Sequence, residues 1–158
     1  MNRLMLCSGI TRREGWVTLD SDPKFGADIV ASIPPLPQEV KAKQWDEIEL
    51  IHGITSFYPW DAEQLLCEIR GVLASGGKLV LEQPDAWWAA KAIIDDGGDF
   101  VKWFFGDSSL RNPEHMNKWA YTPEILEDTL HRAGFLDVHV RKAEYHNPRR
   151  DFRMEAYA

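Results

Sequence analysis

Two stretches of the sequence combine residue types that can bind a nucleotide or move a proton. In "RLMLCSGITRREGWVTLDSD", an apolar segment runs into a small-residue turn, and a second apolar segment ends in acid. This order is typical of a loop that receives a nucleotide cofactor, and equally of two plain strands joined by a turn. In "HGITSFYPW", His52 follows an apolar run. Imidazole titrates near neutral pH, so His52 is a candidate general base; the alternative is a structural histidine at a strand end.

A third candidate region is the segment 99–121, which is rich in aromatic residues and turn formers and has no clean period. Long aromatic loops in small domains are often functional, so we expect this segment to cover a pocket. His115 is its candidate catalytic residue, with Lys118, Trp119 and Tyr121 close by in sequence. The alternative is a satellite cluster of aromatic side chains that packs on the sheet.

Length and composition fit one domain that covers residues 1–158. Hydrophobic residues make up 44% of the chain and charged residues 27%, which is ordinary for a globular protein. No apolar run is long enough to span a bilayer. Cys7 and Cys67 are the only cysteines and belong to no Cys/His cluster, so we expect no metal site, no disulfide and a cytoplasmic location. The net charge of −7 argues against a nucleic-acid partner.

Apolar periods and glycine or proline signals divide the chain into strands and helices. We expect helices near 60–74 and 122–133, the first ended by Gly76 and Gly77 and the second capped by Thr122. The segment "AWWAAKAIIDDGG" also looks helical, whereas the prolines of "IPPLPQEV" exclude regular structure. The expected strands are 3–8, 16–20, 27–31, 47–52, 78–82, 136–142 and 151–157. This pattern predicts an α/β fold: a Rossmann-like, mostly parallel sheet with an antiparallel C-terminal strand.

The first two expected strands lie unusually close together in sequence. About ten residues separate them, whereas a parallel crossover normally takes a dozen or more. The first crossover helix must therefore be shortened or absent. A sheet face that lacks its helix is expected to expose apolar surface, which a second copy of the chain could cover, so we expect a homodimer.

The order and spacing of several segments resemble the class I S-adenosylmethionine-dependent methyltransferases, in a compact branch with a shortened N-terminal half. The segments that carry the resemblance are "REGWVTLDSDP", "ADIVASIPPLP", "WDEIELIH", "LLCEIRGVLASGGKLVLEQPD" and "NKWAYTPEILEDTLHRAGFLDVHV". Together they cover nearly the whole chain. The resemblance implies the fold of that family and S-adenosylmethionine as the cofactor.

The resemblance also implies roles for residues at the carboxyl ends of the first strands. Gly9 matches the second glycine of the family's cofactor loop, and Cys7 stands where a first glycine is expected. Asp20 matches the acid that holds the cofactor's ribose; the alternative is a turn-forming aspartate. Ser32 stands where the family commonly has an acid near the adenine, and His52 falls beside the methyl group.

The implied activity is methyl transfer to a small polar or sugar-like acceptor. The segment "HGITSFYPW" lacks the Asn/Asp-Pro-Pro-aromatic sequence of enzymes that methylate amino groups of DNA bases, and it has Thr55 and Ser56 where the family often has Glu and His. One alternative is a pseudoenzyme or assembly protein with weak or no cofactor binding, which Cys7, Ser32 and Thr55 favour. The other, a nicotinamide-dependent oxidoreductase, is disfavoured because the full GxGxxG fingerprint is missing.

Overall fold

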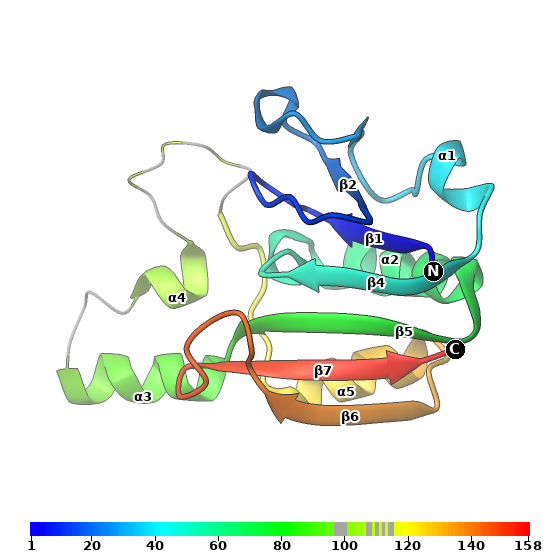
Figure 1. Ribbon diagram of the computed structural model, residues 1–158. Helices are drawn as coiled ribbons and strands as arrows, with labels where there is room; N and C mark the ends of the chain where they lie inside the picture. Colours follow the sequence, from blue (N-terminus) through cyan, green and yellow to red (C-terminus); the bar gives the residue numbers. More distant parts are fainter. Residues whose placement is uncertain (97–100, 107–108, 110, 112, 114–115) are drawn as a thin grey trace.

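A seven-stranded sheet forms the centre of the computed structural model, which describes residues 1–96, 101–106, 109, 111, 113 and 116–158 (Figure 1). The strand order is β3-β2-β1-β4-β5-β7-β6. Neighbouring strands from β3 to β5 run parallel, and β7 is antiparallel to both β5 and β6. The strands are β1 Arg3–Leu6, β2 Trp16–Asp20, β3 Ile29–Val30, β4 Trp45–Ile51, β5 Leu73–Pro84, β6 Asp137–Lys142 and β7 Asp151–Tyr157. The predicted fold class is confirmed, including the antiparallel strand at the C-terminus.

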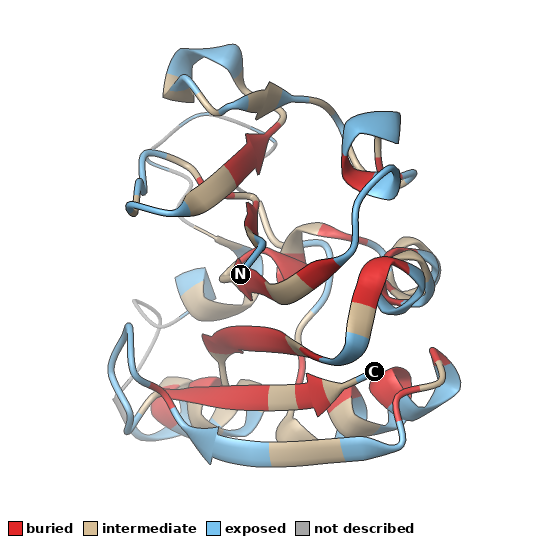
Figure 2. Cartoon of the chain, turned by 45° about the vertical axis from the view of Figure 1, so that its right-hand side comes forward, coloured by how far each residue is buried: buried red, intermediate tan, exposed pale blue. Residues whose placement is uncertain are grey.

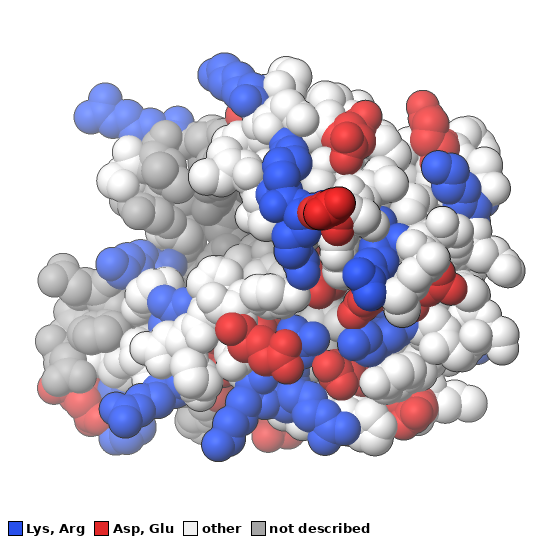
Figure 3. All heavy atoms as spheres, in the orientation of Figure 1, with Lys and Arg blue, Asp and Glu red and all other residues white. Residues whose placement is uncertain are grey.

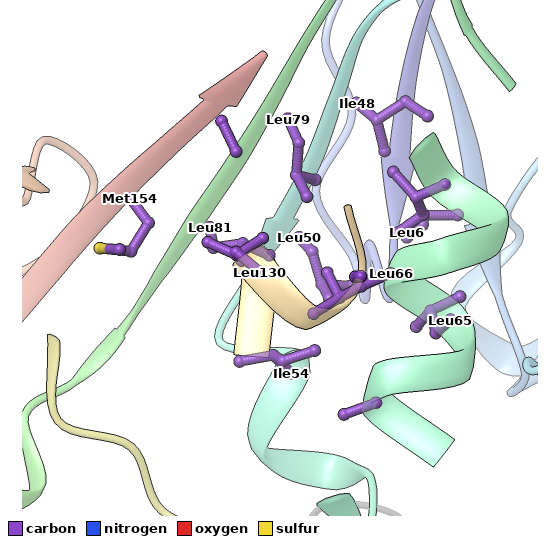
Figure 4. Close-up of a cluster of buried hydrophobic side chains, with 14 of the residues drawn as sticks. Leu6, Ile48, Leu50, Ile54, Leu65, Leu66, Leu79, Leu81, Leu130 and Met154 are labelled. Carbon is purple, nitrogen blue, oxygen red and sulfur yellow. The ribbon is translucent and has the colours of Figure 1, made fainter. Parts of the chain in front are cut away.

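The core lies between the sheet and two helices, α2 and α5, which run behind the sheet in Figure 1. The α-helices are α1 Gln38–Lys41, α2 Pro59–Val72, α3 Ala86–Asp96, α4 Lys102–Phe105 and α5 Pro123–Arg132. Leu65 and Leu66 of α2 and Leu130 of α5 point at leucine and isoleucine side chains of the central strands (Figure 4). Each such side chain contributes roughly 1.5–3 kcal/mol when fully buried. As predicted, the Thr122 hydroxyl caps α5, accepting a hydrogen bond from the Ile125 backbone N–H.

Two local expectations are wrong. Helix α2 ends at Val72, before the glycine pair, and Leu73 already pairs with Trp45 in the sheet. Pairing and burial of Leu73 therefore start β5 early, and the glycines lie inside that strand. The prolines of "IPPLPQEV" also do not exclude regular structure to its end, because a helical turn, α1, begins at Gln38 immediately after Pro37.

No helix joins β1 to β2 or β2 to β3 apart from a single 3-10 turn, so the shortened first crossover is confirmed. The consequence that we expected is wrong, because the face turned to the viewer in Figure 1 is charged rather than apolar. Figure 3 shows acidic and basic side chains interleaved over it. Glu47 lies 3.5 Å from Arg3 and 3.0 Å from Lys78, and Arg153 lies 3.1 Å from Glu155. We call this surface the open face.

Residues from two loops cover the upper part of the open face. The Arg13 guanidinium, from the loop after β1, lies 4.3 Å from the Trp16 ring and 5.0 Å from the Tyr145 ring. It also forms an ion pair with Glu49, whose side chain is only 2% exposed. The Tyr145 hydroxyl, from the loop after β6, donates a second hydrogen bond to Glu49 (2.9 Å). Long charged side chains thus replace a covering helix.

Burial follows this arrangement along the strands. Figure 2 shows β7 buried over most of its length, while the edge strand β6 is largely exposed. The charged open face removes the apolar surface on which we based the expected homodimer, which stays a prediction. Within the described residues, none of the helices is long and apolar enough to cross a membrane.

Candidate cofactor site and the adjoining histidine cluster

A cavity of about 300 Å³ opens at the carboxyl ends of β1, β2 and β4. All five residues that the sequence suggested for a cofactor site line it: Cys7, Gly9, Asp20, Ser32 and His52. The remaining lining residues come from β2, from the loops after β2, β3 and β4 and from the segment before α5: Leu19, Ser21, Phe25, Ala31, Ile33, Gly53, Ser56, Phe57, Asn117 and Lys118. The carboxyl edge of a parallel sheet is where such folds bind their ligands.

The loop after β1 has the backbone that a glycine loop would have. Cys7 has φ 50° and Gly9 has φ 53°, both in the left-handed region that glycine adopts without strain. The Cys7 side chain fits because its neighbour is Gly53, where an added Cβ would lie 2.9 Å from the Cys7 Cβ. Burial, and then the charge of Asp20, raise the pKa of the Cys7 thiol to about 12. Cys7 is therefore a partly exposed thiol in the wall of the cavity that stays protonated at neutral pH.

Asp20 ends β2 and is 8% exposed, so it is part of the packed structure as well as of the cavity wall. One carboxylate oxygen accepts the Gly9 N–H (2.8 Å) and the other accepts the Asp22 N–H (3.0 Å). These bonds tie the Gly9 loop to the end of β2. Each oxygen of an ionised carboxylate has a further lone pair, so Asp20 retains acceptor capacity toward a ligand.

His52 follows the last residue of β4 and has φ 55°, which is uncommon outside glycine and is found where surrounding contacts fix the backbone. Its Nε2 lies 3.2 Å from an Asp151 carboxylate oxygen. Its ring stacks on that of His146, with centroids 3.8 Å apart and planes at 17°. His52 thus combines the two alternatives: it has fixed structural partners, and it faces the cavity.

The partners of His52 are themselves held. The Asp151 side chain is fully buried, and Arg150 donates two hydrogen bonds of 2.5 Å to it. Burial raises the pKa of Asp151, but the Arg150 and His52 contacts outweigh this, and the net shift is downward. Burial, and then the charge of His52, lower the pKa of His146. Asp151 is therefore an ionised carboxylate beside the His52 imidazole, and the stacked His146 imidazole resists protonation.

Comparison with known proteins adds the following. No protein-family model matches the sequence, and no curated protein matches it. Among solved structures, a SAM-dependent methyltransferase from Archaeoglobus fulgidus matches with a TM-score of 0.65 at 16% identity, over 99% of this chain and 86% of that one. A SAM-dependent methyltransferase from Thermotoga maritima matches with a TM-score of 0.66 at 12% identity, over 99% of this chain and 81% of that one. The chain spans about half the length of several other matched structures, including PigF solved with SAH (50% of that chain, TM-score 0.62, 14% identity).

The chain has the class I methyltransferase fold. The cavity described above lies at the carboxyl edge of this sheet, and the suggested residues meet there. The second catalytic candidate, His115, lies outside the described residues. Its neighbours Asn117 and Lys118 line the cavity, and the Lys118 backbone N–H donates to the Thr55 carbonyl (2.8 Å). The segment before α5 therefore closes one side of the cavity.

Sequence reasoning missed His146 and Asp151. Asp151 is 99 residues from His52, and nothing local in the sequence links them. The segment "YHNPRRD" leads into the last expected strand, and its histidine and aspartate were the signal that it contained.

Among the described residues, His52, His146 and Asp151 form a group whose ligand atoms lie within 4.8 Å of one another. A metal ion binds in the plane of an imidazole ring, and two nearly parallel rings 3.8 Å apart do not share such a point. The guanidinium of Arg150 already neutralises Asp151 and would repel a cation. The geometry thus favours proton binding over metal binding, and the absence of a metal site stays a prediction.

Proposed function

We propose that the chain binds S-adenosylmethionine in the 300 Å³ cavity and transfers the methyl group to a hydroxyl of a small polar or sugar-like acceptor. The observation that carries the proposal is the convergence of Cys7, Gly9, Asp20, Ser32 and His52 on one cavity at the carboxyl edge of a methyltransferase fold. The net charge of −7 supports a small molecule rather than a nucleic acid as acceptor.

The residues present fit this cofactor. Among the described residues other than its two chain neighbours, no atom lies within 4 Å of the place where a Cβ on Gly9 would stand, so a ligand can approach this part of the backbone. We assign Gly9 to the amino-acid part, Asp20 to the ribose hydroxyls and Ser32 to the adenine. A carboxylate suits the ribose because it accepts hydrogen bonds from both hydroxyls. The Ser32 side chain is exposed in the cavity wall and offers one hydroxyl.

The cofactor supplies a methyl group that is already activated by its sulfonium, so alignment does most of the work. The contribution of the chain is a base for the acceptor. His52 is engaged with Asp151 through Nε2, so the lone pair of Nδ1 is the one available to take the hydroxyl proton. When the methyl group is transferred, His52 would take the proton of the acceptor hydroxyl, and Asp151 would stabilise the imidazolium.

Calorimetric titration with S-adenosylmethionine, S-adenosylhomocysteine and NAD tests the cofactor. Ser32→Trp places a large side chain in the cavity wall, and Ser75→Trp, at another exposed serine, is the matched control. We expect the wild type and Ser75→Trp to bind the first two ligands and Ser32→Trp to lose them. Binding of NAD alone, or equal affinity in all three proteins, would overturn the proposal.

Cys7 favours a second candidate function, a pseudoenzyme that keeps the fold and has lost transfer. A side chain lines the cavity where the family's loop is expected to have none. In that case Cys7→Gly would raise the affinity for S-adenosylmethionine. Unchanged affinity in Cys7→Gly would remove this argument.

A further inference from the structure

Glu82, on β5, anchors the turn between β6 and β7. Its side chain is fully buried, and its oxygens accept three backbone N–H groups of that turn. Oε1 accepts from Tyr145 (3.0 Å) and His146 (2.8 Å), and Oε2 accepts from Glu144 (2.9 Å). The nearest guanidinium nitrogen, of Arg153, is 3.8 Å away. Hydrogen bonds to an ionised acceptor are the strong ones, so Glu82 fixes the path of the turn.

The anchored turn places His146 on His52. The two rings stack at 3.8 Å, and the His146 Nδ1 lies 3.4 Å from Glu82. Among the described residues, the charged and titratable groups in contact with the His52 ring are Asp151 from β7, backed by Arg150, and His146 from the turn, backed by Glu82. Each imidazole has its own buried carboxylate, and the two rings restrain each other.

We propose that Glu82 and His146 are positioning residues for His52. Glu82 fixes the turn, and the turn holds the His146 ring flat against the His52 ring. The face of the His52 ring is then covered, and only the two nitrogens at its edge are free to act. One of those nitrogens is taken by Asp151, which leaves the other for the acceptor proton. The inference rests on the proposed function, in which His52 is the base. Two charged rings at this distance repel, so a charge on His52 disfavours protonation of His146.

Proton NMR titration of the imidazole C2–H signals tests this arrangement without an acceptor. Wild type, Glu82→Gln and His146→Phe are compared, and His52→Gln assigns the signals. Glu47→Gln is the control for Glu82→Gln because Glu47 is on the same open face and is ion-paired but does not contact the turn. His139→Phe is the control for His146→Phe, since His139 is half exposed on β6.

We expect the wild type and both controls to show two coupled steps, with the His52 signal shifted upfield by the stacked ring. Glu82→Gln replaces an acceptor oxygen by an NH₂ group that faces the N–H groups of the turn, so the turn is released and the two rings separate. The His52 signal then loses its upfield shift, and the two titration steps move closer together. His146→Phe keeps a stacked ring, so His52 keeps its upfield shift and titrates in a single step. If Glu82→Gln does not fold, the titrations of the wild type and His146→Phe still decide whether the His146 ring is stacked on the His52 ring and coupled to it. Independent titration of the two histidines in the wild type would overturn the inference.

The same samples separate this inference from the proposed function. Neither Glu82 nor His146 lines the cavity, so we expect unchanged calorimetric affinity for S-adenosylmethionine in both variants. A wild type that shows the coupled titration but binds no S-adenosylmethionine would refute the proposed function and leave the positioning intact. A wild type that binds S-adenosylmethionine but whose His52 and His146 titrate independently would refute the positioning and leave the proposed function intact.

Discussion

Replacing Arg13 by methionine should destabilise the protein far more than replacing an ordinary surface arginine. Arg13 forms the ion pair with Glu49, which is 2% exposed, and lies over the Trp16 and Tyr145 rings. Methionine keeps much of the aliphatic length but removes the charge. Glu49 would then be buried with the Tyr145 hydroxyl as its remaining polar side-chain partner among the described residues.

The magnitude follows from these contacts. Breaking a buried ion pair by removing one partner typically costs ~3–5 kcal/mol, because a buried charge is left uncompensated. The Arg13 side chain is 30% exposed, so water can reach part of the site and the lower end applies. Loss of the cation–π contacts adds ~0.5–1 kcal/mol. We expect a total of about 3.5–4 kcal/mol, which lowers the melting temperature by roughly 7–16 °C in a chain of this size.

Urea unfolding, followed by far-UV circular dichroism, measures this difference. Arg141→Met is the matched control: Arg141 is on β6, its side chain is 54% exposed, and it lies 3.7 Å from Glu155. An exposed pair of this kind is worth ~0–1 kcal/mol. Glu49→Gln in the Arg13→Met background should recover part of the loss, because the buried charge is gone. Equal effects of Arg13→Met and Arg141→Met would refute the view that long charged side chains replace a covering helix.

Three further predictions follow from single residues. At pH 8, a disulfide reagent should modify only the exposed Cys67 in the folded protein, since the pKa of the Cys7 thiol is raised to about 12, and it should modify both cysteines in urea. Rapid modification of Cys7 in the folded protein would contradict this. Burial and the charge of His52 lower the pKa of His146, so as the pH falls below 6.5 the unfolded chain protonates this histidine before the folded chain does. The free energy of unfolding should therefore fall as the pH drops below 6.5. Urea midpoints measured against pH should show a weaker fall in His146→Phe. Asp20→Asn should weaken S-adenosylmethionine binding by roughly ten- to hundredfold in calorimetry, and it should also lower stability because the carboxylate accepts the Gly9 N–H; unchanged binding would refute the ribose assignment.

Local patterns predicted the sheet well because its strands carry strong alternation. The segment "WDEIELI" became β4 with Ile48 and Leu50 in the core. The same alternation placed Glu47 and Glu49 on the opposite face, and this was the signal that the uncovered face would be charged. The expectation of an apolar face took the missing helix into account but not the residue types that would point toward it.

The cofactor cavity could be predicted because its residues follow strand ends, and strand ends meet at one edge of a parallel sheet. The histidine cluster could not, because its members come from the residue after β4, from the turn before β7 and from the first residue of β7, 99 residues after His52. Only the pairing of β5 with β7 brings the beginning of β7 beside the end of β5. The spacing of apolar residues within a segment does not reveal this long-range strand register.

The turn between β6 and β7 connects the open face to the histidine cluster, because it contacts both Glu49 and Glu82. Here the Tyr145 hydroxyl donates to Glu49 and its backbone N–H donates to Glu82, while Arg13 donates to the same hydroxyl (2.7 Å). The turn that carries His146 is thus held by the open-face network. Arg13→Met should therefore also loosen the stack and bring the titration steps of His52 and His146 closer together, whereas Arg141→Met should leave both signals in place.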